Sequence, residues 1–333
     1  MKPPGLNRRR VITILGAVAG MPLLTRDGHP ENLLQWNGTS LGSPSRLLLY
    51  HPNRTKADRV AALCAAEIER LEQIFALYRD DSELARLNHD GRIAAPSHDL
   101  LLVLSHGTRL SALSAGAFDV TVQPLWNLYA GHFFAPQTPP SQGPDPREVA
   151  AARALVDWRE IAFSGTEVVL QRPGMGITLN GIAQGYVTDR IIGILRDNGF
   201  DRVLADLGRS EIAALGRHPD GRPWQIGLAD PRQPEKFARI LDLAPGAVCT
   251  SGGYGTKFEP SGRYHHLFDT TTGASAGHYI GVSVFSRSAM LADALSTALY
   301  VTPPGRGLDL LGGYSGVTAL VTLPDGETRQ LPA

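Results

Sequence analysis

The sequence predicts an α+β fold with mixed or antiparallel sheets, and three observations carry this prediction. Apolar residues recur at helical spacing in several long segments, short strand-like segments gather in the second half, and the two kinds alternate irregularly. A parallel sheet would instead repeat strand–helix–strand units. The hydrophobic content of 43% and the charged content of 19% are those of an ordinary globular protein.

The first 130 residues predict mainly helices. A lead-in over residues 30–48 runs into a first strand at Arg46–Tyr50, and an amphipathic helix follows over Asp58–Tyr78. Ser82 begins a short second helix that ends at Asn88, and a third helix covers Ser97–Ser114.

Residues 131–147 contain five prolines and predict a long surface loop or a domain seam. Beyond this stretch the pattern predicts helices over Glu148–Trp158, over Ile182–Asn198 with Gly199 as the residue that ends it, and around Asp293. The strands expected in this half are Ile161–Phe163, Val168–Leu170, Gly176–Leu179, Val203–Leu207, Ile212–Leu215, Trp224–Leu228, Arg239–Leu243, Ala247–Thr250, His265–Phe268 and Ile280–Phe285, with a final hairpin over Val317–Leu331.

The N-terminus has the features of a twin-arginine signal peptide over residues 1–19. Arg8, Arg9 and Arg10 precede a short apolar run, and Ala17 and Ala19 suit a signal-peptidase site. The run is too short to cross a bilayer, so we expect a periplasmic protein without a transmembrane anchor. The alternative is a merely basic, disordered start.

Two simple counts restrict the function. Lysine plus arginine equal aspartate plus glutamate at 32 each, which offers no support for nucleic-acid binding. Cys64 and Cys249 match no metal motif, and we interpret them as buried apolar residues, although the sequence leaves open whether they pair.

The helix around Asp293 places one carboxylate in an apolar setting. Asp293 and Thr297 are four residues apart and share a helix face, while Leu291, Leu295 and Leu299 are expected to bind the core on the opposite face. Two hard oxygen ligands flanked by small residues suit a magnesium-type cation that also binds a ligand's phosphate. The alternative is a buried Asp–Thr hydrogen bond within a core helix.

Three other segments bear groups of chemical interest. Thr178–Gly185 leads from a strand into a glycine-bearing helix start, which favours phosphate but also permits plain tight packing. Tyr264–Gly273 collects two histidines and Asp269, so one histidine could act as a base or both could be structural. In Gly116–Trp126, Phe118 and Asp119 could contact a planar ring, or form a strand with an incidental acid.

In their order along the chain, these segments resemble the ApbE family of FAD:protein FMN transferases. The resemblance spans Leu41 to Val301, and its matched blocks are Tyr78–Arg79 with Ser82–Asn88, Gly116–Leu125, Asn180–Tyr186, Pro223–Gly227 with Asp230–Arg232, Thr250–Gly252, His265–Gly273 and Met290–Leu299. It implies a two-lobed, T-fold-related architecture over residues 30–333. It also implies Mg²⁺-dependent transfer of FMN from FAD to a threonine hydroxyl of a target flavoprotein, with release of AMP.

The resemblance also implies roles for individual residues. Asp293 and Thr297 are expected to bind Mg²⁺ through their side chains and Gly181 through its carbonyl, while His266 and Asp269 form the segment that supplies the base. The residues expected to contact FAD are Leu41, Tyr78, Ala117, Phe118, Asp119, Thr178, Gln184 and His266.

The chain departs from the family's usual pattern at several positions. Gln184 stands where the family has a lysine, Thr178 replaces an acid, and the usual Gly-Gly-Asp-Ile block becomes Gly208–Ile212. Gln184 together with the twin-arginine signal resembles the NosX subgroup, which implies a membrane regulator of nitrous oxide respiration as the acceptor. The lost charges keep two alternatives open, a non-catalytic flavin carrier or assembly factor and a pyrophosphatase that cleaves FAD to FMN and AMP.

Overall fold

A computed structural model describes residues 32–135 and 142–332. The predicted signal peptide therefore lies outside the described residues, as does part of the proline-rich segment. The predicted α+β class is confirmed: the main sheet has eight strands in the order β1-β2-β6-β7-β10-β11-β12-β13. Every pair of neighbouring strands in it is antiparallel. Its strands are β1 (Leu33–Ser40), β2 (Ser43–Tyr50), β6 (Val203–Leu207), β7 (Glu211–Leu215), β10 (Gly246–Ser251), β11 (Gly281–Ser286), β12 (Thr318–Thr322) and β13 (Thr328–Leu331).

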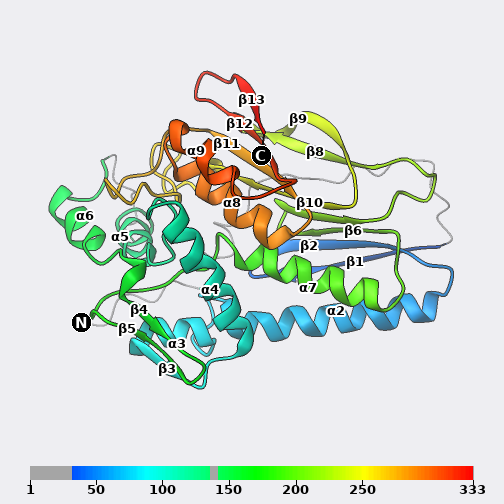
Figure 1. Cartoon of the computed structure of the whole chain (residues 1–333), viewed down its shortest axis with the longest axis horizontal. Coiled ribbons are helices and arrows are strands. Elements are labelled where there is room, and N and C mark those ends of the chain that lie inside the picture. Colours follow the sequence, from blue (N-terminus) through cyan, green and yellow to red (C-terminus); the bar gives the residue numbers. More distant parts are fainter. Residues whose placement is uncertain (1–31, 136–141, 333) are drawn as a thin grey trace.

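The main sheet is buried on both faces, and successive residues of a strand face opposite sides. In β6, Val203 and Ala205 belong to the large core cluster, whereas Leu204 belongs to a smaller cluster on the other side. The large cluster joins the sheet to three helices, α2 (Arg54–Phe75), α7 (Ala183–Asp197) and α8 (Ala289–Val301). Figure 1 shows α2 and α7 running along this face. The hairpin β8 (Trp224–Asp230) and β9 (Gln233–Leu243) covers the smaller cluster.

A second group of elements lies beside the helices at one end of the sheet (Figure 1). It contains a three-stranded sheet, ordered β3-β5-β4, and an aromatic cluster that includes Tyr129, Phe258 and Phe268. The elements of this group are β3 (Arg92–Ala94), β4 (Ile161–Phe163), β5 (Glu167–Leu170), α3 (Glu83–Asp90), α4 (His98–Leu113), α5 (Gln123–Phe134) and α6 (Pro146–Arg153). Ser82 and Ser97 cap α3 and α4 by accepting backbone N–H bonds, as expected of serine at a helix start.

Two predicted strands were wrong. Gly176–Leu179 pairs with no described strand, because the side chain of Asn88 takes the place of a neighbouring strand. The Asn88 amide donates to the Ile177 carbonyl at 2.7 Å and accepts the Ile177 N–H at 2.6 Å. His265–Phe268 forms only isolated bridges at its two ends, because His265 pairs with Lys257 and Phe268 with Ser275.

The proline-rich segment is shorter than predicted, because α5 continues to Phe134 and α6 begins at Pro146. Proline suits the first turn of a helix, where its missing N–H would have no partner anyway. The helix predicted over Glu148–Trp158 begins two residues earlier than predicted, at Pro146, and ends at Arg153. The sequence analysis also missed β1, β3, α5 and α9 (Pro304–Leu311).

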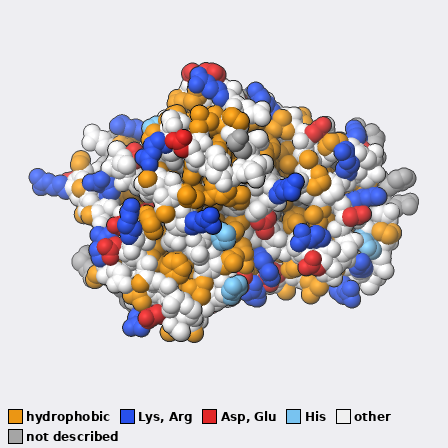
Figure 2. Space-filling view, in the orientation of Figure 1, with side chains coloured by type: hydrophobic (Ala, Val, Ile, Leu, Met, Phe, Trp, Pro, Cys, Tyr) orange, Lys and Arg blue, Asp and Glu red, His pale blue; other side chains and the backbone are white. Residues whose placement is uncertain are grey.

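Three further observations concern the cysteines, membrane-spanning helices and the surface charge. Cys64 and Cys249 are both buried and free, as interpreted. None of the helices that the structure describes is both long and apolar enough to cross a membrane. Figure 2 shows basic and acidic side chains interspersed over one face of the molecule, in keeping with the balanced net charge.

Candidate active site

One end of the main sheet brings together the segments that carry the predicted site residues. The turn between β1 and β2, at Leu41, lies at this end, and so does the turn between β6 and β7, since Ser45 pairs with Leu207. The end of β10 joins them through the pair Cys249–Glu211. The first turn of α7 and the middle of α8 pack against the same end, as the contacts below describe.

Helices α7 and α8 cross at Gly185. A Cβ atom at this position would lie 2.7 Å from both the Ala289 carbonyl carbon and the Asp293 Cβ, so only glycine lets the helices approach this closely. The Gly185 N–H donates to Asp293 Oδ2 at 2.9 Å. The crossing therefore fixes the Asp293 carboxyl against the start of α7.

Asp189, one turn further along α7, holds the N-terminus of α8. Its carboxylate accepts the N–H groups of Ala289 at 2.7 Å and Met290 at 3.0 Å, and the Ser288 hydroxyl at 2.6 Å. A carboxylate at a helix N-terminus also interacts favourably with the helix dipole. Asp189 and Gly185 together fix the position of α8 relative to α7.

The three predicted cation ligands lie close together. A Cβ at Gly181 would be 3.1 Å from Thr297 Oγ1, so the backbone of Gly181 passes directly over the Thr297 hydroxyl. Thr297 lies one turn after Asp293 on α8. The Thr297 hydroxyl is 3.1 Å from that of Ser251, which adds a further oxygen to the group.

The chemistry of this group fits a small divalent cation. Asp293 is only 3% exposed, and burial raises the pKa of its carboxyl to about 7. Of its two oxygens, Oδ2 accepts one backbone N–H. A carboxylate, a hydroxyl and a nearby backbone carbonyl are the hard oxygen donors that Mg²⁺ prefers.

The surroundings of Asp293 correct one expectation from the sequence. Helix α8 was expected to bind the core through one face, yet Ala292, Ala294 and Ser296 are buried as well as Leu295 and Leu299. Leu291, expected on the core face, is only partly buried. The helix is enclosed on nearly all sides because α7 covers its polar face.

Gln184 is buried and uses its amide within the protein. Its Nε2 donates to Ser40 Oγ at 2.9 Å and to the Leu207 carbonyl. These bonds tie the start of α7 to the ends of β1 and β6 beside Leu41, whose φ of 46° places it in the left-handed region. Gln184 thus supplies no charge to the site.

The segment around Phe118 lies next to Gly181. Phe118 Cε2 would be 3.3 Å from a Cβ at Gly181, and the Thr178 N–H donates to the Val120 carbonyl at 2.8 Å. Asp119 is buried, and its oxygens accept from Thr121 at 2.8 and 2.6 Å and from the Trp158 N–H at 3.1 Å. In this structure Asp119 shapes the segment from within, and its contact with FAD stays a prediction.

The two histidines have different surroundings. His265 is buried and shares a hydrogen bond of 3.0 Å with the Ala276 carbonyl. His266 is partly exposed, and its Nδ1 is 3.3 Å from the Thr256 carbonyl, to which only a protonated Nδ1 can donate. This tautomer leaves Nε2 with a free lone pair. Part of the His266 surface is exposed, yet neighbouring residues remove most of the water from around its ring, and this loss of hydration lowers its pKa to about 4, so the ring is neutral near pH 7.

Asp269 mainly shapes its own turn. Its Oδ1 accepts the N–H of Thr271 at 2.8 Å and the Thr271 hydroxyl at 2.6 Å. The neighbouring Thr270 hydroxyl donates to the Gly116 carbonyl at 2.7 Å, which joins this loop to the Ala117–Phe118 segment. The structure therefore places His266 and Phe118 on adjoining loops, while a catalytic role for Asp269 stays a prediction.

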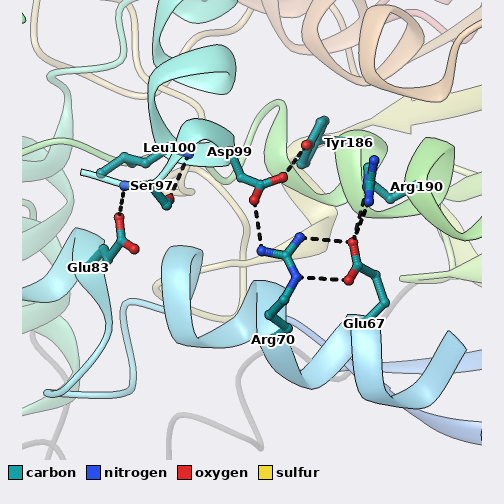
Figure 3. Close-up of polar contacts among 8 residues, drawn as sticks. All are labelled: Glu67, Arg70, Glu83, Ser97, Asp99, Leu100, Tyr186 and Arg190. Atoms are coloured by element: carbon teal, nitrogen blue, oxygen red, sulfur yellow. Dashed lines mark hydrogen bonds and ion pairs between the residues drawn. The ribbon is translucent and has the colours of Figure 1, made fainter. Parts of the chain in front are cut away.

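A polar network holds α7 from the side away from α8 (Figure 3). Arg70 of α2 binds Glu67 at 2.8 and 2.9 Å and Asp99 of α4 at 2.8 Å. Tyr186, next to Gly185, donates its hydroxyl to Asp99, and Arg190 of α7 binds Glu67 at 3.0 Å. The network thus anchors the first turns of α7 on two other helices.

Tyr78 lies just beyond the end of α2. Burial and the carboxylate of Glu72 raise the pKa of its hydroxyl. Phe75, three residues before it, packs edge-on against the ring of Tyr186 at 5.9 Å between centroids. Tyr78 is therefore placed near the start of α7, and its contact with FAD stays a prediction.

The depressed pKa of His265 predicts how stability responds to acid. Burial lowers this pKa from 6.5 to about 4, so the stability that neutral His265 contributes is complete above pH 6.5 and is lost progressively as pH falls from 6.5 to about 4. Between pH 7 and pH 4.5, we expect the free energy of unfolding of His265→Gln to fall by about 2–3 kcal/mol less than that of wild type. Urea unfolding at both pH values measures this difference. An equal loss in both proteins would contradict a neutral, buried His265.

Several residues of this region were missed by the sequence analysis. Ser251 and Ser40 are small hydroxyls within or beside recognised blocks, and Glu211 is an acid in an otherwise apolar strand. An acid at the start of an otherwise apolar strand was a usable signal for Glu211. No sequence signal placed Ser40 beside Gln184, because 144 residues separate them.

Comparisons with known proteins show the family of this chain. The model of the ApbE family matches residues 41–321. The FAD:protein FMN transferase of Vibrio cholerae is 30% identical over 300 residues, covering 88% of this chain and 89% of the relative, and that of Treponema pallidum is 32% identical over 314 residues, covering 87% and 84%.

Solved structures show the same likeness. The flavin transferase ApbE from Vibrio cholerae superposes with a TM-score of 0.76 at 27% identity, covering 90% of this chain and 96% of that one. The apo flavinyl transferase ApbE of Pseudomonas stutzeri gives a TM-score of 0.74 at 30% identity, covering 90% and 94%. From the fold, the gathered site residues and these matches, we conclude that the chain belongs to the ApbE family.

Proposed function

We propose that this protein is an FAD:protein FMN transferase that moves FMN from FAD to a threonine hydroxyl of a flavoprotein and releases AMP. Relatives of that name match it over most of both chains. The observation that carries the proposal is the convergence of Gly181, Asp293 and Thr297 beside the Phe118 segment. This is the arrangement of hard oxygen donors that a cation bound to a diphosphate needs.

The reaction forms a bond between the threonine oxygen and the FMN phosphorus and breaks the phosphorus–oxygen bond to AMP. When bound by Asp293, Thr297 and the Gly181 carbonyl, Mg²⁺ would neutralise charge on the diphosphate. Nε2 of His266, to which none of the described residues makes a hydrogen bond in this tautomer, accepts the threonine proton. Because the pKa of His266 is about 4, this nitrogen is available as an acceptor at neutral pH.

A nucleotide assay tests the reaction. Purified protein with FAD, MgCl₂ and an exported flavoprotein domain as acceptor should release AMP in equal amount to FMN bound covalently, and EDTA should stop both. AMP release at the same rate without the acceptor would indicate FAD hydrolysis instead. FAD binding without any AMP would indicate a flavin carrier.

We also propose where the protein acts and on what. The arginine pair and apolar run of residues 8–19 support export by the twin-arginine route to the periplasm. The combination with Gln184 supports a NosX-like role, with a membrane regulator of nitrous oxide respiration as the acceptor. Fractionation of cells that carry the full chain tests the location, and loss of export on changing Arg8 and Arg9 to lysine tests the route.

A further inference from the structure

Glu211 is a buried carboxyl that faces the same helices as the candidate cation site. It begins β7, and Ala213, two residues on, belongs to the core cluster that contains α7 and α8. Its cross-strand partner is Cys249, whose thiol lies 3.4 Å from the Ala289 carbonyl of α8. Directly paired residues of antiparallel strands share a face. Glu211 therefore points to the turn of α8 that precedes Asp293.

The contacts of Glu211 hold its side chain beside α7. The Ser210 hydroxyl donates to Oε1 at 2.7 Å. Oε2 lies against Gly208, where a Cβ would collide with it and would be 3.0 Å from the Cγ of Gln184. Gly185, next to Gln184, binds Asp293. Gln184 and Gly185 are consecutive residues of α7, so the two carboxyls lie beside the same turn of that helix.

No positive side chain among the described residues pairs with Glu211 or Asp293 to balance their negative charges. Among the described residues neither Glu211 nor Asp293 forms an ion pair, since the Ser210 hydroxyl binds one carboxyl and the Gly185 N–H binds the other. Two carboxylates in a medium of low polarity need a nearby positive charge if both are to ionise. A divalent cation would balance the combined negative charge of the two carboxylates.

We propose that Glu211 is a second carboxylate of the cation site and, together with Asp293, sets the affinity of this chain for its divalent cation. The proposal rests on the cation site of the proposed function. Its test needs neither FAD nor an acceptor protein, so it is separate from the transfer reaction.

The test is cation binding by the metal-free protein. Chelator-treated wild-type protein is titrated with Mn²⁺, followed by electron paramagnetic resonance of the free ion, and with Mg²⁺ in competition. Glu211→Gln keeps the shape of the side chain and its bond from Ser210, and we expect it to weaken Mn²⁺ binding at least about tenfold. Glu211→Asp, which keeps the charge, should recover part of the affinity.

Asp206→Asn is the matched control. Asp206 is a buried carboxyl on the neighbouring strand, paired with Ile212 on the opposite face of the sheet, and Arg46 and Arg209 already act on it. We expect this variant to bind Mn²⁺ within about twofold of wild type. Urea unfolding confirms that each variant is folded.

Three results would overturn the proposal, and the third would also overturn the proposed function. Binding by Glu211→Gln within threefold of wild type would exclude Glu211 from the site while leaving the cation site itself in place. Equal weakening by Glu211→Gln and Asp206→Asn would show a general effect of charge. A wild-type affinity in Asp293→Asn would instead remove the cation site on which the proposed function depends.

Discussion

Replacing Asp293 with asparagine should reduce the rate of FMN transfer at least about 10³-fold, because several kcal/mol of charge stabilisation at the diphosphate would be lost. The side-chain carbonyl of the asparagine would still accept the Gly185 N–H, so the crossing of α7 and α8 should survive. The comparison therefore isolates the charge of the carboxylate from its structural hydrogen bond. Transfer rates measured with saturating FAD and MgCl₂ give the result.

Two further measurements separate the loss of the cation from a loss of FAD binding. Flavin fluorescence should show that Asp293→Asn still binds FAD, since Phe118 and the adjoining loops are untouched. Excess Mg²⁺ should recover little of the rate, because the missing ligand also positions the cation. A transfer rate within tenfold of wild type would show that Asp293 does not hold the cation used in the reaction.

Replacing Gly185 with alanine should have the largest effect on stability, a loss of about 3 kcal/mol. The added Cβ would collide with the carbonyl group of Ala289 and with the Cβ of Asp293. The Ala289 carbonyl belongs to the backbone of α8, so rotating a side chain cannot relieve the collision. The helices must separate instead, which also moves Asp293 away from the start of α7. Urea unfolding and Mn²⁺ binding measure the two effects.

Gly193→Ala is the matched control for this substitution. Gly193 lies in the same helix, and a Cβ there would meet nothing within 4 Å. Alanine stabilises an open helical position by about 0.5–1 kcal/mol relative to glycine. An equal free energy of unfolding for Gly185→Ala and Gly193→Ala would contradict the close crossing of α7 and α8.

The sequence could predict several helices of this fold because their caps are local, whereas α5 and α9, which have no side-chain cap, were missed. Ser82 and Ser97 begin α3 and α4, and Gly199 follows α7 with a φ of 77°. The strands at 176–179 and 265–268 were wrong because their hydrogen-bond partners are distant side chains or single bridges. Periodicity along one segment carries no information about such partners.

The same limit applied to the site. Asp293 and Thr297 are one turn apart, so a single helix reveals them as a pair. The approach of Gly181 to Thr297 and of Gln184 to Ser40 depends on tertiary packing, and the family resemblance supplied the first of these but not the second. Glu211 was noticed only as part of an altered block, because its position facing α8 follows from strand pairing with Cys249.

The central claim is that this chain transfers FMN to threonine through the site at Asp293. The most direct test is mass spectrometry of exported proteins from source cells in which the gene is deleted and then restored. We expect at least one threonine peptide carrying FMN to disappear on deletion and to return with the wild-type chain but not with Asp293→Asn. Persistence of every such peptide after deletion, or their full return with Asp293→Asn, would contradict the claim.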